Sequence, residues 1–593
     1  VRIEGPSGGT GFQPVVLLNR NNASLGSFAI HLTGGDDVTL SNLDITGAEY
    51  GIVALSGADS DRLLVTNSRI RGNAQKGLYV SSMNDDLLVA NSQIYDNPYG
   101  GIYVEYASGA TIRDNVVYNT TLGNRGIELF SPASATATGN ESYGHGAGIF
   151  ASNSGTGSVT VSNNNVHDNR DFGIDAGTNV QVIGNTVSRT RTGFGSGTGG
   201  PLGIKVTSGS VARDNTVFDN IRGIQAFDST AINNRVFHND LVGISGHFAA
   251  QLLNNTVYSN GVGIFTQNFT GRIANNLVYD NSNDGIWLAG GNAARIEGNT
   301  IYQATTGDAV QVGGPHPEFF TSNSAVTNTQ FTNNILRVGE DYAIHVAADS
   351  QAGMTSDYND FVLAGTGKLG RWEGTDFTTR EDWFHELGLD GHGIFADPQF
   401  IDFDGADNIL GYDVANNVDR GLDDDFRVGA TSPTIDAGHP LSGFVGEPAP
   451  NGQRVNLGHT GDTALAATSA EQSLQVLSPN GGERFEAGTP VTITWQSAGL
   501  TLTRAVALID AGGAGAENWL ADKYKVAGTI FSFTTPVDTS NVTNPAPAST
   551  YQVGTYGGFG AGNRVAYQLP VTDGSYSLRL HFVEPGLGAG QRP

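Results

Sequence analysis

A short phrase recurs about a dozen times in the first 350 residues of this chain. It consists of an Asn, an aliphatic residue two positions later, often a second Asn, and then Gly-Ile at the start of an apolar strand. Most steps between successive first Asn residues span 19 to 25 residues. A period of this size predicts a solenoid. Strands of four or five residues, joined by turns rich in Gly and Asn, favour a parallel β-helix with one coil per repeat. The first Asn of the repeats falls at Asn42, Asn67, Asn91, Asn115, Asn140, Asn165, Asn185, Asn215, Asn234, Asn255, Asn276, Asn299 and Asn334.

The repeat has a simple physical logic. Side chains alternate along a strand, so the Ile after the Gly and the apolar residue two positions later point inward and stack from coil to coil. Asn tolerates left-handed turn conformations and bonds to nearby backbone. Aligned Asn side chains can also bond along the solenoid axis. We therefore interpret nearly all of these Asn residues as maintaining the fold.

These repeats resemble the right-handed parallel β-helix superfamily, which includes pectate lyases and many bacterial carbohydrate-binding and sugar-hydrolysis modules. The resemblance covers roughly residues 1–460. It implies an all-β fold, a right-handed parallel β-helix followed by a partial β-sandwich. It leaves function open, because that superfamily contains lyases, hydrolases, epimerases and adhesins.

Composition narrows the possible partners. The chain has 58 acidic and 31 basic residues, a net charge of -27, and no Cys. A strongly acidic chain is an unlikely partner for nucleic acid or an anionic membrane. No apolar stretch reaches 18 residues, so membrane insertion is not expected. Absent Cys excludes disulfides and thiolate metal sites. The chain begins at Val1 without a signal peptide, so we expect a processed or cut N-terminus. No feature of the sequence predicts the oligomeric state.

Changes in pattern along the chain indicate four parts. The phrases Asp-Pro-x-Phe at 397–400 and Ser-Pro-x-Ile-Asp-Ala-Gly at 432–438 resemble the end-caps of secreted β-helix proteins. A solenoid needs a cap, since its last coil leaves an open strand edge. We predict β-helix repeats over 1–350, the last coil and end-cap over 351–466, a linker with an Ig-like fragment over 467–504, and a truncated β-sandwich over 505–593.

The last part carries a second resemblance. The segments 507–529 and 567–584 look like the malectin domain, a β-sandwich that binds glucose-type oligosaccharides or related ligands. The chain stops where that family continues into further strands, so we expect a truncated domain. The resemblance makes Tyr524, Tyr551 and Tyr556 candidates for stacking on sugars, with packing of the sandwich as the alternative.

The alternation of strands predicts a surface row on the β-helix. If the Ile of each Gly-Ile strand points inward, the next residue points outward, as does the residue two positions further on. Coils stack at about 4.8 Å, so ten coils make a stripe on the order of 50 Å long, which suits an extended polymer. Aromatic side chains are frequent in this row, and exposed aromatics in a row indicate a binding surface, with cover by neighbouring loops as the alternative. The predicted glycan-binding residues are Tyr79, Tyr103, Glu105, Phe150, Arg189, Arg191, Gln225, Phe265 and Trp287. The row as predicted also contains Ser81, Phe130, Ser152, Gly177, Thr207, Phe227, Ser245, Gln267, Gln311 and His345.

Five residues in or beside the row are candidates for catalysis: Lys205, Asp175, Glu128, His247 and Arg222. In a lyase or epimerase, Lys205 or His247 would remove the proton alpha to a uronate carboxylate. Arg189, Arg191, Arg222 or a calcium ion would neutralise that carboxylate. In a hydrolase, Glu128 and Asp175, two coils and about 9–10 Å apart, would form an acid and base pair. An ion pair between Lys205 and Asp175 is the structural alternative.

Other signs of chemistry are weaker. The stretch 402–408 is rich in oxygen ligands, so Asp402, Asp404 and Asp407 are weak candidates for binding calcium, with a solvated acidic loop as the alternative. Calcium is the one cofactor considered. The resulting hypothesis is a secreted or cell-surface bacterial protein that acts on a polysaccharide, first as a lyase or epimerase and next as a hydrolase. A non-catalytic glycan-binding protein or adhesin is the alternative.

Overall fold

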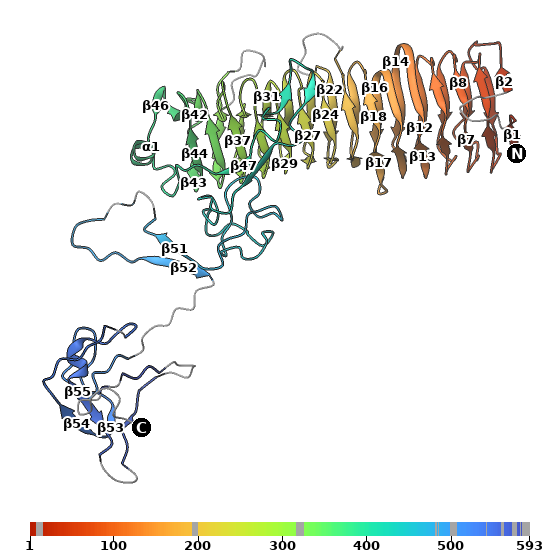
Figure 1. Cartoon of the computed structure of the whole chain (residues 1–593). Helices are drawn as coiled ribbons and strands as arrows, with labels where there is room; N and C mark the ends of the chain where they lie inside the picture. Colours follow the sequence, from red (N-terminus) through yellow and green to blue (C-terminus); the bar gives the residue numbers. More distant parts are fainter. Residues whose placement is uncertain are drawn as a thin grey trace. The chain divides into compact units, whose positions relative to one another are not determined.

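The computed structural model describes residues 1–6, 16–153, 155–191, 200–315, 325–480, 483, 485–498, 507–540, 542–558, 563–571, 578–581 and 583. The chain divides into two compact units, Val1–Gly499 and Leu500–Pro593. The first unit is a parallel β-helix whose coils each contribute strands to three faces (Figure 1). The pairings between successive coils are parallel, so the predicted all-β solenoid is confirmed.

The first face is a 15-stranded sheet. Its strands are β1 (Arg2–Glu4), β4 (Thr39–Ser41), β7 (Leu64–Thr66), β10 (Leu88–Ala90), β13 (Ala110–Arg113), β15 (Ala135–Thr138), β17 (Val159–Ser162), β20 (Val180–Ile183), β23 (Val211–Arg213), β26 (Thr230–Ile232), β29 (Gln251–Leu253), β32 (Arg272–Ala274), β36 (Arg295–Glu297), β40 (Gln330–Thr332) and β43 (Thr355–Asp357).

The second and third faces are joined into a 29-stranded sheet because two long strands, β14 (Val116–Phe130) and β16 (Glu141–Ser152), run from one face to the other. The other strands of the second face are β2 (Val16–Asn19), β5 (Leu43–Thr46), β8 (Arg69–Arg71), β11 (Gln93–Tyr95), β18 (Asn165–His167), β21 (Thr186–Ser188), β24 (Thr216–Phe218), β27 (Arg235–Phe237), β30 (Thr256–Tyr258), β33 (Leu277–Tyr279), β37 (Thr300–Gln303), β41 (Ile335–Val338) and β44 (Asp360–Leu363).

The third face is built from the Gly-Ile strands. They are β3 (Phe28–Leu32), β6 (Tyr50–Ala54), β9 (Lys76–Val80), β12 (Gly100–Glu105), β19 (Phe172–Ala176), β22 (Leu202–Thr207), β25 (Arg222–Phe227), β28 (Val242–His247), β31 (Val262–Gln267), β34 (Ile286–Leu288), β38 (Val310–Val312), β42 (Tyr342–Val346) and β45 (Lys368–Trp372), followed by the antiparallel β46 (Thr375–Phe377). The last coil, formed by β43, β44 and β45, lies after residue 350, inside the range 351–466 predicted for the last coil and end-cap.

Close approach of successive coils explains the Gly of the repeat. A Cβ atom on Gly223 would lie 2.3 Å from the carbonyl oxygen of Gly243 in the next coil, and one on Gly243 would lie 2.6 Å from a methyl carbon of Val257. Such distances leave no room for a side chain, so Gly is required there. The Ile that follows fills the core: Ile224, Ile244 and their equivalents are buried. Stacked in this way, the inward residues make one continuous hydrophobic core.

A ladder of buried Asn side chains runs along one turn of the β-helix, as the sequence predicts. In a typical rung, Asn255 Nδ2 donates to Asn276 Oδ1 at 2.9 Å and to the carbonyl of Ala231 at 2.9 Å. The ladder passes through Asn115, Asn140, Asn164, Asn185, Asn215, Asn234, Asn255, Asn276, Asn299, Asn334 and Asn359. In the earlier coils Ser68 and Ser92 carry the rung, while the predicted Asn67 and Asn91 occupy the left-handed turn positions beside them. Asn164 takes the place expected for Asn165.

The C-terminal part of the first unit closes the β-helix and returns along its second face. Helix α1 (Arg380–Leu387) begins at Thr379, whose hydroxyl accepts from the backbone N–H of Asp382, and ends at the left-handed Gly388. Its Trp383 is buried in the main core. The short pairs β47 (Phe400–Asp402) with β50 (Asp425–Val428), and β48 (Tyr412–Asp413) with β49 (Val418–Asp419), then pack against the second-face aromatics from Phe237 to Tyr302.

The remaining strands are short. β35 (Gly291–Asn292) pairs with β39 (Val326–Thr327), and β51 (Ser473–Ser478) pairs with β52 (Thr494–Ala498). In the second unit, β53 (Lys525–Ala527) pairs with β56 (Ala566–Tyr567), and β54 (Thr529–Ser532) pairs with β55 (Val553–Tyr556), beside the 3-10 helix η1 (Ala548–Tyr551). Among the described residues, no helix has the length and apolar character needed to cross a membrane.

Candidate functional site

The predicted outward row exists on the third face. Backbone pairing places Tyr103 beside Glu128, Phe150 beside Asp175, and Asp175 beside Lys205. The row continues in register through Gln225, Ser245, Phe265, Trp287, Gln311, His345 and Arg371. A second outward row runs parallel to it through Glu105, Phe130, Ser152, Thr207, Phe227, His247 and Gln267. The alternation of the Gly-Ile strands thus predicted the register correctly.

Exposure does not follow the prediction along the whole row. Trp287 is fully buried and Phe265 is 6% exposed, so the expectation that both present exposed rings is wrong. They form a small apolar cluster with Val242, Val262 and Ala289, and Trp287 Nε1 donates to the carbonyl of Gly313 at 3.1 Å. Gln225 is also buried. Cover by neighbouring residues, the alternative weighed for the aromatic row, holds at this end.

The ring faces of the half-buried aromatic residues in the row contact neighbouring side chains. The rings of Tyr79 and Tyr103 stack 5.1 Å apart with an interplanar angle of 12°, and the ammonium of Lys76 lies 4.2 Å from the centre of the Tyr103 ring. The guanidinium of Arg125 lies 3.8 Å from the centre of the Phe150 ring. Tyr79 also donates to Glu105 at 2.7 Å. These faces are therefore already occupied by neighbours, which removes them as flat platforms for sugar rings.

Charged residues gather in the first half of the third face. Glu128 accepts on Oε1 from Arg125 and on Oε2 from Lys76, the latter at 3.4 Å. Two coils further, Asp175 Oδ1 lies 3.2 Å from Lys205 Nζ of the next coil, and that ammonium is 5.3 Å from the centre of the Phe172 ring. We call Lys76, Arg125, Glu128, Asp175 and Lys205 the central cluster. Phe150 separates Glu128 from Asp175, as the predicted two-coil spacing requires.

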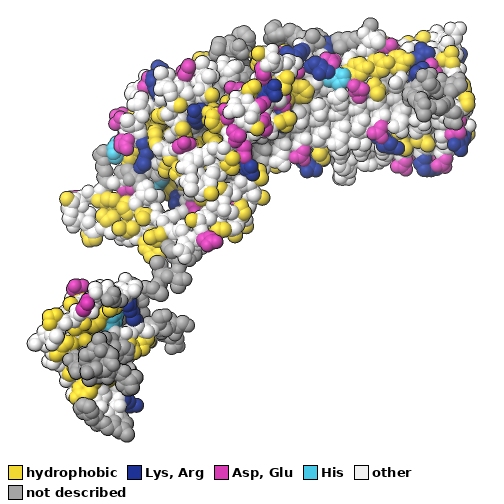
Figure 2. Space-filling view, in the orientation of Figure 1, with side chains coloured by type: hydrophobic (Ala, Val, Ile, Leu, Met, Phe, Trp, Pro, Cys, Tyr) yellow, Lys and Arg dark blue, Asp and Glu magenta, His cyan; other side chains and the backbone are white. Residues whose placement is uncertain are grey.

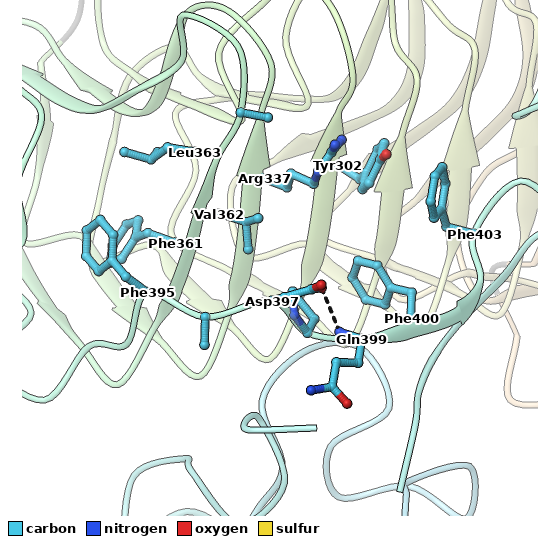
Figure 3. A pocket seen from close by; sticks show the side chains of 13 residues that line it. Tyr302, Arg337, Phe361, Val362, Leu363, Phe395, Asp397, Gln399, Phe400 and Phe403 are labelled. Carbon is cyan, nitrogen blue, oxygen red and sulfur yellow. Dashed lines mark hydrogen bonds between the residues drawn. The ribbon is translucent and has the colours of Figure 1, made fainter. Parts of the chain in front are cut away.

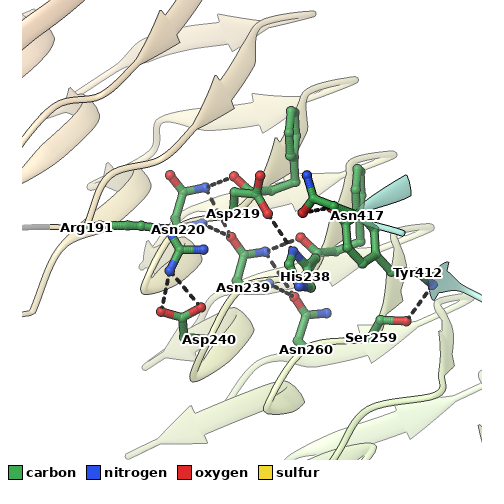
Figure 4. A network of polar contacts seen from close by, with 12 residues as sticks. Arg191, Asp219, Asn220, His238, Asn239, Asp240, Ser259, Asn260, Tyr412 and Asn417 are labelled. Carbon is green, nitrogen blue, oxygen red and sulfur yellow. Dashed lines mark hydrogen bonds and ion pairs between the residues drawn. The ribbon is translucent and has the colours of Figure 1, made fainter. Parts of the chain in front are cut away.

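Two of the three predicted Arg residues lie away from the row. Arg189 makes a bidentate ion pair with Asp168 at 2.9 and 2.8 Å. Arg191 pairs with Asp240 at 2.7 Å at the turn where Asn220, Asn239 and Asn260 form a second amide ladder (Figure 4). Both Arg residues are thus already neutralised by acids outside the row.

Arg222 and His247 do lie on the third face, in adjacent strands β25 and β28. His247 is buried, stacks 4.2 Å from Phe227, and has Gln225 Nε2 3.3 Å from its own Nε2. Burial, followed by the charge of Arg222, lowers the pKa of His247 to about 4. Burial also lowers the pKa of Arg222. The main role of a buried neutral imidazole at this position is packing.

A second group of polar residues lies at the other end of the third face. Asp308 Oδ2 is 2.8 Å from His345 Nδ1, and Asp308 Oδ1 accepts from the backbone N–H of Tyr342 at 3.0 Å. With its proton on Nδ1, the imidazole keeps Nε2 as an acceptor, and Nε2 has no hydrogen-bond partner among the described residues. The His345 side chain is 30% exposed, whereas that of Asp308 is 8% exposed. A buried carboxylate orienting a half-exposed imidazole is an arrangement suited to proton transfer.

The hydroxyl of Tyr342 completes this group. It accepts from Arg371 Nη1 at 3.0 Å and donates to Asp376 Oδ1 at 2.8 Å. Its ring centre lies 5.3 Å from that of His345. Behind them, Asp284 accepts from the backbone N–H of Asp308 at 3.0 Å. Burial, followed by the charge of Asp308, raises the pKa of Asp284 to about 7.

We call Asp284, Asp308, Tyr342, His345 and Arg371 the end cluster. Sequence reasoning named His345 as a member of the row but assigned it no role, and it missed the other four. A usable indication was present: Asp284 directly precedes a Gly-Ile strand, and Asp308 stands at the equivalent place one coil later. Each residue lies two positions before the strand that follows it, β34 or β38.

The weak calcium candidates do not gather into a site. Asp407 pairs with Arg420 at 3.3 Å and accepts from the backbone N–H of Ile409 at 3.0 Å. Across the described ranges, no group of three or more His, Asp or Glu side chains is arranged to hold a metal ion. For Asp402, Asp404 and Asp407 the geometry agrees better with the solvated acidic loop.

Acidic and basic side chains are interspersed on the visible face of the β-helix rather than segregated (Figure 2). The many one-to-one ion pairs explain this pattern, including Arg71 with Asp44 at 2.9 Å. The paired residues cancel one another's charge, so they do not concentrate the net charge of -27 at either cluster.

Comparison with known proteins bears on the fold. The model of the family described as "Right handed beta helix region" matches residues 28–187, 125–269 and 202–361, which together span more than half of the chain. No curated protein matches. Among solved structures, the Azotobacter vinelandii mannuronan C-5 epimerase AlgE6 A-module is 12% identical, with a TM-score of 0.29, over 62% of this chain and 86% of that one. Pectate lyase Pel9A is 15% identical, with a TM-score of 0.25, over 72% of this chain and 87% of that one. At these TM-scores neither structure supports an argument about this chain, and the family match alone identifies the fold.

Proposed function

Because the chain belongs to the right-handed β-helix family, we propose that it acts on an extended acidic polysaccharide that lies along the third face. The reaction proposed is removal of the proton alpha to a uronate carboxylate, as in a lyase or an epimerase. The observation that carries this proposal is the Asp308–His345 pair beside the Tyr342–Arg371 pair.

Each group of the end cluster has a role in that chemistry. Nε2 of His345 takes the proton from C5 of the uronate, and Asp308 stabilises the imidazolium that forms. Arg371, 41% exposed, offers its guanidinium to the substrate carboxylate, which makes the C5 proton easier to remove. In a lyase, the C5–H electrons form the C4–C5 double bond, the C4–O4 bond breaks, and Tyr342 protonates the leaving oxygen. In an epimerase, Tyr342 returns a proton to C5 from the opposite face instead.

The central cluster then serves binding. Its cations and carboxylates lie on neighbouring coils, at about 4.8 Å per coil, with Phe150 between Glu128 and Asp175 in the row. A polymer with a charge or hydroxyl on every sugar can exchange these internal ion pairs for contacts of its own. This assigns Lys205, Asp175 and Glu128 to binding rather than to the proton-transfer step first considered for them.

A non-catalytic glycan-binding protein is the second candidate. One observation favours it: both oxygens of Glu128, the ammonium of Lys205 and the guanidinium groups of Arg189 and Arg191 are engaged in ion pairs. A hydrolase that uses Glu128 and Asp175 would have to break these pairs first. Secretion and a bacterial cell-surface location are part of the same proposal.

We also propose that the second unit binds sugar in the manner of a malectin-like domain. A cavity of about 660 Å³ there is lined mainly by polar residues, including Asp510, Ser532, Thr534, Ser549 and Gln552. Tyr551 is 5% exposed and packs inside the unit, whereas Tyr524 and Tyr556 are 41% and 38% exposed. Tyr524 and Tyr556 are therefore the better candidates for contact with a sugar.

The test is a panel of pectin, alginate, glycosaminoglycans, xylan and β-glucans, with and without calcium. Absorbance at 235 nm reports unsaturated uronate, and proton exchange at C5 in deuterated water reports epimerisation. A response in either channel on a uronate polymer supports the proposal. Reducing ends without either response would favour a hydrolase. Retention on one polymer without any reaction would favour the non-catalytic protein.

A further inference from the structure

A cavity of about 580 Å³ opens on the second face (Figure 3). Its floor is formed by Tyr302, Arg337 and Val362, which are outward neighbours in the successive strands β37, β41 and β44. Its roof is the segment 395–403, which leads from α1 to β47. The volume lies within the range of about 300–1,000 Å³ that small-molecule sites occupy.

The cavity forms where a stack of outward aromatic side chains on the second face ends at an arginine. Phe218, Phe237, Tyr258 and Tyr279 stack one on the next at 4.8–5.1 Å, and Tyr302 follows in register. The next residue in register is Arg337, whose guanidinium lies 4.1 Å from the centre of the Tyr302 ring. A cation thus ends a run of aromatic rings and lies at the wall of the cavity.

Arg337 has an unmet hydrogen-bonding need. Its Nη1 is shielded from solvent and has no hydrogen-bond partner among the described residues. Leaving a buried donor unpaired costs about 1–3 kcal/mol, and more for a charged group. Asp397 lines the same cavity, but its Oδ1 accepts from the backbone N–H of Gln399 at 2.9 Å, and no ion pair joins it to Arg337. No ion pair among the described residues offsets the charge of Arg337, so an anion in the cavity is the partner that its guanidinium lacks.

The other walls restrict what kind of anion fits. Phe361, Phe395, Phe400 and Phe403 give the cavity apolar ring surfaces, and Phe395 is 41% exposed. The carboxylate of Asp397 adds an acceptor for hydroxyl groups. A ligand suited to all three features has one carboxylate, a ring with an apolar C–H face, and hydroxyls on its edge.

We propose that this cavity binds a single carboxylated sugar ring, a hexuronate or the uronate end of an oligosaccharide. The carboxylate pairs with Arg337, the ring lies against Phe400 or Phe403, and a hydroxyl donates to Asp397. This site is separate from the end cluster, and the proposal does not depend on the reaction assigned to the third face.

The experiment is titration of the whole chain by calorimetry with galacturonate, glucose and acetate. We expect galacturonate to bind at least tenfold more tightly than either glucose or acetate. Equal binding of acetate and galacturonate would show a bare anion site and overturn the sugar assignment. Equal binding of glucose would remove the role of Arg337. Absence of binding by all three would overturn the proposal.

Two variants locate the site. Arg337→Gln removes the cation, and Ala364→Trp, at the residue directly after β44, fills the cavity while leaving Arg337 in place. Both should weaken galacturonate binding at least tenfold, with thermal unfolding checked in parallel. Because Ala364→Trp keeps the charge, its failure to weaken binding would place the ligand elsewhere even if Arg337→Gln does not fold. His345→Gln, in the end cluster, should leave this binding unchanged and so separates it from the third face.

Discussion

The two clusters of the third face occupy the same strand positions but arrange their charges differently. In the central cluster, cation and carboxylate lie directly opposite each other, as with Lys205 and Asp175 at 3.2 Å. In the end cluster, Asp308 contacts one nitrogen of His345, and the other has no hydrogen-bond partner among the described residues. The first arrangement cancels charge, whereas the second orients a group that can accept a proton.

Burial sharpens this difference. Asp308 is nearly enclosed while His345 is 30% exposed, so the orienting group is protected and the reacting group is accessible. In the central cluster the anion is again the buried partner, but the cations fold back over it: Glu128 is 10% exposed beneath Lys76 and Arg125. A row of titratable residues therefore does not reveal by itself which members are available for chemistry.

The largest expected effect separates the clusters by activity. His345→Gln should lower the rate of uronate proton removal by about 10²–10⁴-fold, the usual contribution of a general base. Lys205→Ala should lower it by about tenfold or less, through binding. Initial rates at 235 nm, or proton exchange at C5, measure both.

A reversed ranking would break the comparison. If Lys205→Ala abolished activity while His345→Gln kept it, the central cluster would carry the chemistry, as the sequence first suggested. Thermal unfolding of both variants excludes a folding defect as the cause.

The next effect concerns stability. Glu128→Gln keeps the size of the side chain but leaves Lys76 and Arg125 as neighbouring cations without their shared anion. The expected loss is about 2 kcal/mol in the free energy of unfolding, between the values for exposed and buried ion pairs. Urea unfolding of the variant beside the wild type measures it. No loss at all would mean that the central cluster is held in place by packing alone.

The smallest effect compares the histidines. Burial lowers the pKa of His247 to about 4. As the pH falls through about 6.5, the unfolded chain therefore binds a proton on this residue that the folded chain does not bind. Stability should therefore fall as the pH falls from about 6.5 towards 4. Between pH 7 and 5.5, His247→Gln should lose less stability than the wild type by on the order of 1 kcal/mol.

His145 and His459, whose pKa values are also lowered to about 4 by burial, remain in the variant and keep part of the pH dependence. Identical pH dependence of the wild type and His247→Gln would contradict the buried neutral state of His247.

The sequence predicted the structural features that depend on the repeat period. The alternation after Gly-Ile placed Tyr103, Glu128, Asp175 and Lys205 in one register, and the backbone pairing agrees. It also predicted the Asn ladder, because a rung needs only one side chain per coil. The ion pair of Lys205 with Asp175 was foreseen as an alternative, since adjacent positions in register must meet.

The sequence could not predict what depends on lateral packing. Trp287 reads as an outward residue, yet its ring is fully buried and bonded to the carbonyl of Gly313. His345 and Asp308 lie 37 residues apart, across a coil longer than the usual repeat, so their contact is not visible in the period. Arg189 and Arg191 follow the turn between faces, and a shift of one or two residues there moves a side chain off the row.

The return of the cap along the second face links segments that are distant in sequence. Tyr258 donates to Asp419 at 2.7 Å across 161 residues, and Asn275 donates to the carbonyl of Gly461 at 2.7 Å across 186. The coils before Phe218 contact mainly their neighbours, as in an ordinary repeat array, and can open one after another from the N-terminal end. The returning cap segment contacts several of the later coils, and it must detach before any of these coils separates. We therefore expect the C-terminal half of the β-helix to unfold as one cooperative block that contains both the end cluster and the Arg337 cavity.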